Sequence, residues 1–269
     1  MKKIFFIILI PFLLGAGPIG IYESGVYDGK GIVIDATGYN QGIYVYGVEN
    51  VVIKGYEVKN ASQFCVQVEN SKNVIVDGLN IHDCGEAGAF LYDGSNYKVI
   101  NSTLINTGQF GARFADSQNV SAINNTVRNL KRFTDSRGLD FENVQSGNAS
   151  LNTIYDIGDG HTDGAGIETF DSSDFTAAGN TIYNVRSGIE SKAGTKDINF
   201  HFYLKNKINN VWYGIEYGSY PVDNGFRATG GFFGYNTIQA KDIGLHLQEP
   251  QEVGRNSIWA PTPVFIDMR

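Results

Sequence analysis

The sequence predicts an all-β solenoid in which each coil of the chain is one repeat. Asn50, Asn73, Asn96 and Asn119 follow one another at a constant interval of 23 residues. A constant period in the twenties is typical of solenoids, because stacked repeats of equal length bury one continuous core. Leucine-rich repeats have similar periods, but the chain lacks the leucine consensus that defines them.

A column made mostly of glycine marks one strand in each coil. An apolar residue directly follows each member, and two positions further comes a second residue that is mostly apolar. This period of two predicts strands with one face in a core. We therefore expect a single-stranded right-handed parallel β-helix of about nine to ten coils, spaced about 4.8 Å apart. The members of the column are Gly42, Cys65, Gly88, Gly111, Gly138, Gly166, Gly188, Gly214 and Gly244.

A further column predicts the bend between two strands of each coil. Asn and Gly adopt left-handed backbone angles more readily than other residues, which suits a tight bend. Asn side chains stacked from coil to coil can also form hydrogen bonds with one another. The members of this column are Gly55, Gly78, Ser102, Asn125, Asn152, Asn180, Asn206, Asn236 and Asn256.

These columns, with turns such as Ile123-Asn124-Asn125-Thr126-Val127, resemble those of the pectin-lyase-like superfamily. The resemblance covers nearly all of the chain after its first residues and implies a parallel β-helix of the polysaccharide lyase or glycoside hydrolase type. It leaves the reaction open, because a function belongs to a site and not to a fold.

The first 16 residues have the features of a secretory signal peptide. Lys2 and Lys3 precede an apolar run from Ile4 to Leu14, and small residues follow it. A membrane-spanning helix needs roughly 20 apolar residues, so a single N-terminal anchor is only the alternative. We expect residues 1–16 to be removed on export and residues 17–269 to form one β-helix domain. The mature protein is then secreted or at the cell surface, with no membrane span.

The composition excludes two classes of protein. With 28 acidic and 21 basic residues the formal net charge is -7, which excludes a basic nucleic-acid binder. A content of 42% hydrophobic residues excludes a disordered chain. Cys65 and Cys84 are the only cysteines. They form either a disulfide, which an exported protein would keep, or two buried thiols.

Four consecutive coils place a carboxylate two positions after the column glycine, where the side chain should point outward. We call these residues, Asp140, Glu168, Glu190 and Glu216, the acid column. Carboxylates about 5 Å apart repel one another by roughly 3 kcal/mol at an effective dielectric constant of 20. The acid column therefore needs a cation, a shared proton or basic neighbours. The outward positions read in full Tyr44, Gln67, Phe90, Arg113, Asp140, Glu168, Glu190, Glu216 and His246.

Charged residues near the acid column are candidates for this role. Most coils after Gly111 are longer, and loops lengthened on one edge of a regular scaffold are where binding sites are usually built. His161 lies in such a loop and is either a proton-transfer element or an exposed turn residue. The candidates are Arg113 one coil before Asp140, Glu142 and Lys192 two residues beyond Asp140 and Glu190, and Arg137, His161 and Asp163 in the longer loops.

The first chemistry that fits is calcium-assisted β-elimination. A calcium ion takes six to eight oxygen ligands and would neutralise the carboxylate of a substrate uronate. A basic side chain would then remove the proton beside that carboxylate. The expected calcium ligands are Asp140, Glu142, Glu168 and Glu190, and the candidate bases are Lys192, Arg137 and Arg113.

Two other interpretations stay open at this point. Asp140 and Glu168 could act as acid and base in glycoside hydrolysis, with their mutual repulsion raising one pKa. Alternatively, the acids could form a solvated surface that lysines bridge.

Two fragments resemble the chondroitinase B and alginate lyase families. They are Asp140-Phe141-Glu142, an outward acid pair, and Glu190-Ser191-Lys192 on a later strand. Those families hold calcium with side-chain oxygens on this sheet and use Lys and Arg nearby. The resemblance implies a polysaccharide lyase.

Aromatic residues gather around the same region, and outward rings could stack on sugar faces. We therefore expect a polysaccharide as substrate or ligand. They are Tyr44, Tyr46, Phe90, Tyr92, Phe170, Tyr213, Tyr217 and Tyr220, of which Tyr217 is expected in the core.

Neither end of the sequence has an amphipathic capping helix, although solenoids normally cover their end coils. This predicts either an incomplete sequence or an end-to-end homo-oligomer. A non-catalytic fibre, adhesin or carbohydrate-binding module is the corresponding alternative function.

Overall fold

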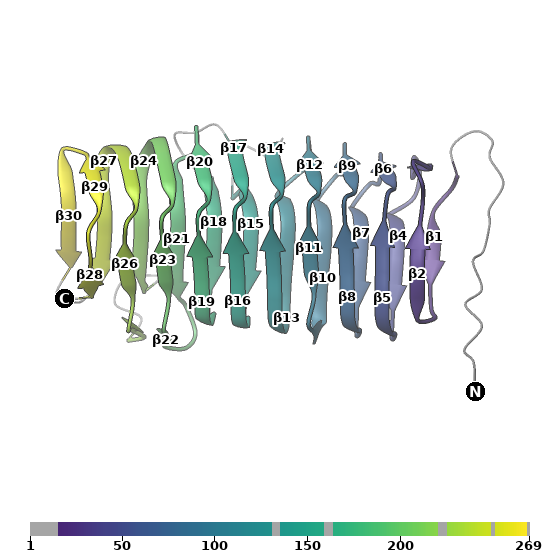
Figure 1. Ribbon diagram of the computed structural model, residues 1–269, viewed down its shortest axis with the longest axis horizontal. Coiled ribbons are helices and arrows are strands. Elements are labelled where there is room, and N and C mark those ends of the chain that lie inside the picture. The colour runs from purple at the N-terminus through teal and green to yellow at the C-terminus, as the bar shows by residue number, and fades with distance from the viewer. Residues whose placement is uncertain (1–15, 131–134, 159–163, 220–224, 249–250, 268–269) are drawn as a thin grey trace.

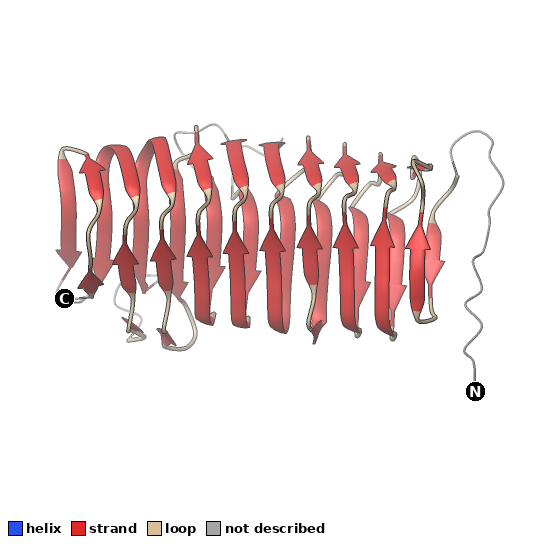
Figure 2. Ribbon diagram, in the orientation of Figure 1, coloured by secondary structure: helices blue, strands red, loops and turns tan. Residues whose placement is uncertain are grey.

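The computed structural model describes residues 16–130, 135–158, 164–219, 225–248 and 251–267, which form a solenoid of parallel strands (Figure 1). The described residues contain strands, turns and loops but no helix (Figure 2). No helix in this part of the chain could therefore cross a membrane. Strands of successive coils pair in parallel, which confirms the predicted parallel β-helix.

The first ladder contains the strands that the glycine column predicts, and each strand pairs in parallel with its counterpart in the next coil. Its strands are β1 (Ile19–Ile21), β4 (Gln41–Tyr46), β7 (Phe64–Glu69), β10 (Ala87–Ser95), β13 (Phe110–Ile123), β15 (Arg137–Glu142), β18 (Ala165–Phe170), β21 (Ser187–Ala193), β24 (Lys207–Ser219), β27 (Thr237–Gln248) and β30 (Thr262–Asp267).

Two further ladders complete each coil. The long strands β13, β24 and β27 each run through two ladders. The second ladder adds β2 (Gly25–Asp28), β5 (Glu49–Lys54), β8 (Lys72–Asp77), β11 (Lys98–Ile100), β16 (Gln145–Ser150), β19 (Ser173–Ala178), β23 (Phe202–Leu204), β26 (Phe232–Gly234) and β28 (Glu252–Val253). The third adds β3 (Val33–Asp35), β6 (Glu57–Lys59), β9 (Asn80–His82), β12 (Thr103–Ile105), β14 (Thr126–Leu130), β17 (Thr153–Ile157), β20 (Thr181–Tyr183) and β29 (Ser257–Trp259), while β22 (Ile198–Asn199) pairs with β25 (Ala228–Thr229).

The core lies between the ladders and is filled by the inward residue of each alternating pair. In β15, Leu139 and Phe141 are completely buried, and the Phe141 ring packs 4.8 Å from the Phe175 ring, measured between centroids. Gly138 shows why glycine prevails in the glycine column. A Cβ atom on Gly138 would lie 2.5 Å from the carbonyl oxygen of Gly166 and from Ile154. Glycine is therefore required at this position for steric reasons.

The Asn members of the bend column form a buried ladder of their own. The Oδ1 atom of Asn180 accepts hydrogen bonds from the backbone N–H and the side-chain amide of Asn152, at 2.9 and 3.0 Å. Asn180 in turn donates to Oδ1 of Asn206 in the next coil. The predicted stacking of Asn side chains is therefore confirmed.

The expected left-handed backbone at these positions is correct for the glycines and wrong for the asparagines. Gly55 and Gly78 have φ angles of 66° and 64°. In later coils the left-handed residue is the one before the column Asn, such as Gly179 with φ of 65° or Leu151 with φ of 59°. The Asn instead turns its side chain inward, because there it pairs buried backbone groups that water cannot reach.

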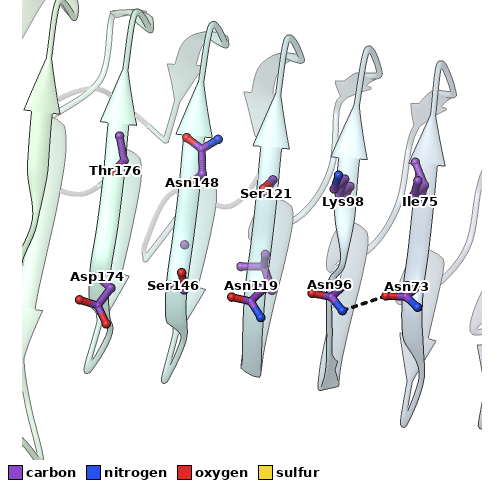
Figure 3. Close-up of a pocket in the computed structure, with 12 residues that line it drawn as sticks. Asn73, Ile75, Asn96, Lys98, Asn119, Ser121, Ser146, Asn148, Asp174 and Thr176 are labelled. Atoms are coloured by element: carbon purple, nitrogen blue, oxygen red, sulfur yellow. Dashed lines mark hydrogen bonds between the residues drawn. The ribbon is translucent and has the colours of Figure 1, made fainter. Parts of the chain in front are cut away.

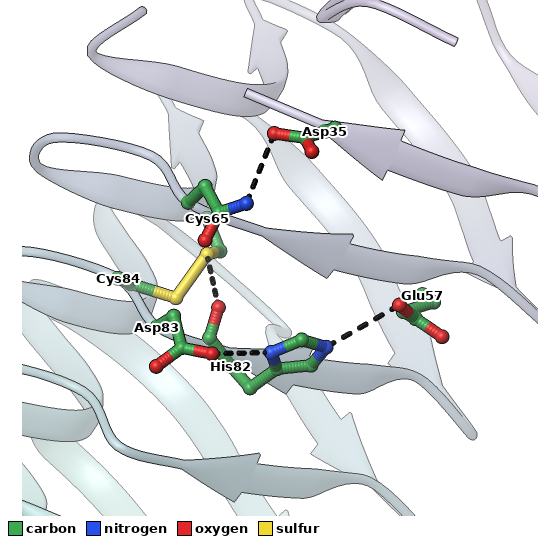
Figure 4. Close-up of a disulfide and its surroundings, with 7 residues drawn as sticks. Asp35, Glu57, Cys65, His82, Asp83 and Cys84 are labelled. Atoms are coloured by element: carbon green, nitrogen blue, oxygen red, sulfur yellow. Dashed lines mark hydrogen bonds and ion pairs between the residues drawn. A yellow bond between two sulfur atoms is a disulfide. The ribbon is translucent and has the colours of Figure 1, made fainter. Parts of the chain in front are cut away.

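Cys65 and Cys84 form a disulfide between neighbouring coils, with a Cα–Cα distance of 5.6 Å (Figure 4). Gly85 donates a backbone hydrogen bond to Ala61, so the chain beside Cys84 stacks on the turn that precedes Cys65. Of the two sequence-based alternatives, the disulfide is correct. Both cysteines are buried, with at most 1% of their surface exposed.

Replacing both cysteines with Ser is expected to lower the free energy of unfolding by about 3 kcal/mol. A closed loop of this size restricts the unfolded chain, and removing that restriction favours unfolding. Chemical denaturation of the variant and of the wild type, each with and without reductant, measures the effect. Reductant should destabilise the wild type alone; an equal effect on both proteins, or on neither, contradicts the prediction.

A polar groove of about 760 Å³ crosses the outer surface of the second ladder from β8 to β19 (Figure 3). Asn73, Asn96 and Asn119 follow one another along it, and Asn96 donates a hydrogen bond to Asn73 at 2.8 Å. Asn73 donates likewise to Asn50. These amides bond one another, so we interpret the groove as a structural seam between coils.

Candidate functional site

The acid column forms a single file on the outer surface of the first ladder. Asp140 of β15 pairs in register with Glu168 of β18, Glu168 with Glu190 of β21, and Glu190 with Glu216 of β24. Arg113 precedes Asp140 in the same file. The strands alternate between core and surface residues, so equal spacing from the column glycine puts all of these side chains on one face.

The file is much less exposed than the sequence suggests. Only 3% of Asp140 and 4% of Glu168 is accessible to solvent, and 13% of the side chain of Glu190. These side chains lie on the outer face of the ladder as expected, but they are buried there and not exposed to solvent. Long basic side chains pair with the carboxylates and take the place of water around them.

Arg113 pairs with the first acid of the file. Its Nε lies 3.2 Å from Oδ2 of Asp140 without an aligned hydrogen bond, and its Nη2 bonds Glu142. The guanidinium lies over the rings of Phe110 and Phe90, at 4.6 and 5.6 Å from their centroids. Arg113 therefore joins the charged part of the face to its aromatic part.

Glu168 is held by two cations at the centre of the file. Nε of Arg137 lies 2.5 Å from its Oε1, and Nζ of Lys192 lies 3.1 Å from its Oε2. Lys192 also pairs with Oε1 of Glu190 at 3.0 Å. Sequence spacing predicts the position of Lys192, and the structure adds that this one ammonium group bridges two coils.

Neighbouring acids in the file have pKa values shifted in opposite directions. Burial and the charge of Glu168 raise the pKa of Asp140 to about 7, although Arg113 and Arg137 oppose this. Burial also acts to raise the pKa of Glu168, but Lys192 and Arg137 outweigh it and the pKa lies below the usual 4.5. As the pH falls below about 7, a protonated Asp140 therefore stands beside the carboxylate of Glu168.

The same alternation continues in the next two coils. Burial raises the pKa of Glu190 to about 7 against the opposing charge of Lys192. The pKa of Glu216 is lowered, because hydrogen bonds from His246 and Ser187 outweigh its burial. Ser187 donates to Glu216 at 2.6 Å.

The basic residues of the site are held in their charged forms. Burial acts to lower the pKa of Arg137 and of Lys192, but the carboxylates beside them outweigh burial and raise both values. A side chain that keeps its proton stabilises negative charge and does not remove a proton from a substrate. This argues against Arg137 and Lys192 as bases in an elimination.

The predicted calcium ligands do not fit a calcium ion. Asp140, Glu142 and Glu168 each already face a guanidinium or ammonium group, and so does Glu190. Within the described ranges, no group of three or more His, Cys, Asp or Glu side chains is arranged to hold a metal ion. Calcium binding stays a prediction from the sequence, and no step below depends on it.

Of the predicted aromatic residues, Tyr44, Tyr46, Phe90 and Tyr92 lie within the first four coils, on β4 and β10, whereas Phe170 lies on β18 and Tyr213 on β24. The rings of Tyr44 and Tyr46 stack at 6.0 Å, and those of Phe90 and Tyr92 at 4.7 Å. Tyr217 is 1% exposed and lies in the core, as predicted. His161, Asp163 and Tyr220 lie outside the described residues.

A buried polar network under the site was missed from the sequence. His201 receives a hydrogen bond from the hydroxyl of Tyr203 and donates one to the carbonyl oxygen of Ser172, both at 2.8 Å. Burial lowers the pKa of His201 to about 4, so the imidazole is neutral. The network continues through Ser191 to Thr169. The sequence holds one indication of this network: Thr169 and Ser191 are polar residues at inward positions of the first ladder.

The fold and the file of charged side chains define a β-helix protein with a candidate site on one outer face. A family model described as "Right handed beta helix region" matches residues 19–160, more than half of the chain. The chain belongs to this family, which confirms the predicted handedness. A comparison of the sequence with curated proteins finds no match.

Solved structures with the same fold share little sequence with the chain. PfbA, a surface adhesin of Streptococcus pneumoniae, superposes with a TM-score of 0.64 at 14% identity, covering 94% of this chain and 72% of that one. A tailspike protein of E. coli bacteriophage HK620 in complex with a pentasaccharide superposes with a TM-score of 0.56 at 12% identity, covering 90% of this chain and 49% of that one. The pectate lyase Pel9A superposes with a TM-score of 0.58 at 14% identity, covering 97% of this chain and 67% of that one. The chain thus spans about half of the tailspike's length, and these likenesses concern the fold alone.

Proposed function

We propose that the protein binds a polysaccharide along the outer surface of the first ladder and cleaves it by glycoside hydrolysis at Asp140 and Glu168. The observation that carries this proposal is the pair of carboxyl groups of Asp140 and Glu168, which occupy facing positions on adjacent strands and have pKa values shifted in opposite directions. Glycoside hydrolysis needs one carboxylic acid to protonate the leaving oxygen and one carboxylate on the other side of the bond. Asp140 supplies the acid, and Glu168 the carboxylate.

The spacing of the pair favours retention of configuration at the sugar carbon. Asp140 and Glu168 occupy facing positions on adjacent strands, which lie about 4.8 Å apart in a sheet. Retaining enzymes hold their carboxyl groups about 5–5.5 Å apart, whereas inverting enzymes need about 6.5–9.5 Å to admit water. Glu168 then attacks the sugar carbon, the bond to the leaving oxygen breaks, and that oxygen takes the proton of Asp140. Water hydrolyses the glycosyl ester, with Asp140 as the base.

The aromatic surface and the known properties of similar folds support a polysaccharide as ligand. Rings of Tyr46, Phe90 and Tyr92 lie on the same face as the carboxyl pair, and flat rings stack on the apolar faces of sugars. The phage tailspike was solved with a pentasaccharide, and Pel9A is a pectate lyase. The disulfide supports export, because disulfides persist in oxidising compartments.

β-Elimination is the second candidate, and the cations of the site favour it. Arg113, Arg137 and Lys192 lie along the file, and a guanidinium or ammonium group can pair with a uronate carboxylate. An acidic polysaccharide therefore remains the first substrate class to test. The raised pKa values of Arg137 and Lys192 place this reaction behind hydrolysis.

Incubation with pectate, alginate, chondroitin and neutral polysaccharides tests the proposal. We expect new reducing ends without the ultraviolet absorbance of unsaturated uronates, unchanged by a chelator, and retained configuration by NMR. Absorbing products would replace hydrolysis with elimination. Binding without cleavage of any substrate would leave a carbohydrate-binding module or adhesin, and the predicted end-to-end assembly would then be tested by the molecular mass in solution.

A further inference from the structure

A pocket of about 430 Å³ lies at the N-terminal end of the first ladder, where β1 meets β4. It is continuous with the outward file of the site, because Gly20 of β1 pairs with Tyr44, and Tyr44 with Gln67 of the next coil. Tyr44 lies four coils before Asp140, which corresponds to about 19 Å at the usual strand spacing. The pocket is thus separate from the carboxyl pair but lies on the same face.

Tyrosine rings form the walls of this pocket. Tyr22 and Tyr39 line the pocket and are 63% and 57% exposed, so both rings are accessible to a ligand. Tyr44 forms a third wall, and its hydroxyl donates a hydrogen bond to Glu69 at 2.9 Å, which fixes its ring. Two exposed rings and one fixed ring therefore border one small volume.

The position of Tyr22 depends on a glycine in the outward file. Gly20 occupies the place that Tyr44, Gln67 and Phe90 fill in later coils. A Cβ atom on Gly20 would lie 2.6 Å from the ring of Tyr22. The missing side chain lets this ring lie across the strand and border the pocket.

The polar groups of the pocket are neutral amides with unused hydrogen-bonding capacity. Asn40 accepts from Ser62 through Oδ1, and Gln41 donates to Gln67 through Nε2. Within the described part of the chain, the amide N–H groups of Asn40 and the Oε1 atom of Gln41 have no hydrogen bond. None of the described residues that line this pocket is charged.

We propose that this pocket binds an uncharged sugar ring, stacked on Tyr22 and Tyr39 and hydrogen-bonded by Asn40 and Gln41. Aromatic faces match the C–H surface of a pyranose, while one free donor and one free acceptor match its hydroxyl groups. A uronate carboxylate would find no cation among these described residues. The inference rests on the proposed polysaccharide ligand and adds that the bound chain contains neutral units about four coils from the cleavage point.

Calorimetric titration tests the pocket with a neutral oligosaccharide chosen from an array of neutral and uronate-containing glycans. Tyr22→Ala and Tyr39→Ala are each expected to raise Kd about tenfold. Gly20→Ala should cause a similar loss with every ring still present, because the new methyl group displaces Tyr22. Tyr22→Phe should keep most of the affinity.

Trp259→Ala is the matched control, since Trp259 is 61% exposed on β29, in the third ladder. It should leave Kd unchanged, and all variants should melt at the wild-type temperature. Two results would overturn the inference: binding to uronate-containing glycans alone on the array, or a Kd for a neutral ligand that is unchanged in Tyr22→Ala and Tyr39→Ala.

The experiments separate this inference from the proposed cleavage. Asp140→Asn should still bind the neutral oligosaccharide while losing turnover. Tyrosine-dependent binding by a wild-type protein that cleaves nothing would support the pocket and reject the hydrolase. Cleavage with a KM that is unchanged in Tyr22→Ala and Tyr39→Ala would support the hydrolase and reject the sugar-binding pocket.

Discussion

Asp140→Asn and Glu168→Gln are each expected to lower kcat at least about 1000-fold, the scale of losing a general acid or a nucleophile. Asparagine keeps the shape and neutrality of the protonated Asp140 but cannot protonate a leaving oxygen. Glutamine at position 168 cannot form the ester with the sugar. Both rates come from reducing-end assays on the polysaccharide that the wild type cleaves.

The two substitutions differ in what they do to the fold. Asp140 is largely protonated below pH 7, so Asp140→Asn changes little charge and should fold as the wild type does. Glu168→Gln leaves Arg137 and Lys192 without their shared carboxylate, and breaking a buried ion pair costs about 3–5 kcal/mol. Asp140→Asn therefore remains decisive if Glu168→Gln unfolds.

Glu216→Gln is the matched control, because it makes the same chemical change in the same file, two coils beyond Glu168. Its carboxylate bonds Ser187 and faces His246, away from the proposed acid and nucleophile. Its turnover should stay within a few-fold of the wild type. Wild-type turnover in Asp140→Asn, or an equal loss in Glu216→Gln, would show that the chemistry lies elsewhere.

The pH profile follows from the same pair. Hydrolysis needs Asp140 protonated, so the rate should fall as the pH rises through about 7. It also needs Glu168 ionised, and because the pKa of Glu168 lies below 4.5, the acid limb should fall below that value. An alkaline optimum would contradict this assignment and favour a base that must lose a proton.

Asn180→Ala is expected to lower the free energy of unfolding by about 3 kcal/mol or more. The substitution removes the acceptor of the backbone N–H of Asn152 and the donor to the carbonyl oxygen of Ala149, both buried. Each buried polar group left without a partner costs about 1–3 kcal/mol. Denaturant titration measures the change.

Two further variants test whether the amide itself is needed. Asn180→Asp keeps the shape but places a carboxylate oxygen against the oxygen atoms of Ala149 and Asn206, so it should destabilise at least as strongly. Asn148→Ala on the outer surface of the second ladder is the control and should stay within about 0.5 kcal/mol of the wild type. A small effect of Asn180→Ala would mean that water replaces the side chain.

The sequence predicts the fold and the file of acids well, because both follow from periodicity. Equal spacing from the column glycine was enough to bring Asp140, Glu168 and Glu190 onto one line. The pairing of Arg137 with Glu168 depends on a side chain that reaches across coils at the start of β15, and no sequence period encodes that reach. The burial of the acid column cannot be predicted from the sequence for the same reason, because it depends on basic side chains that reach across coils.

The sequence does not predict the buried network around His201, for a different reason. His201 precedes β23 and lies outside the columns, so its turn into the core depends on local backbone geometry. The polar inward residues Thr169 and Ser191 could have indicated that a partner was needed, since buried hydroxyl groups are almost always hydrogen-bonded. The period of two predicts their inward position, but no sequence period identifies their hydrogen-bond partners.

The alternating pKa shifts along the acid column show that each carboxyl group titrates under the influence of the charges beside it. Each member that holds a proton lowers the cost of ionising its neighbours, and each ionised member does the opposite. A positively charged ligand or a substitution at one end would therefore change the proton occupancy of the adjoining members. The stacking of coils thus places equivalent residues of successive repeats close enough for their charges to influence one another.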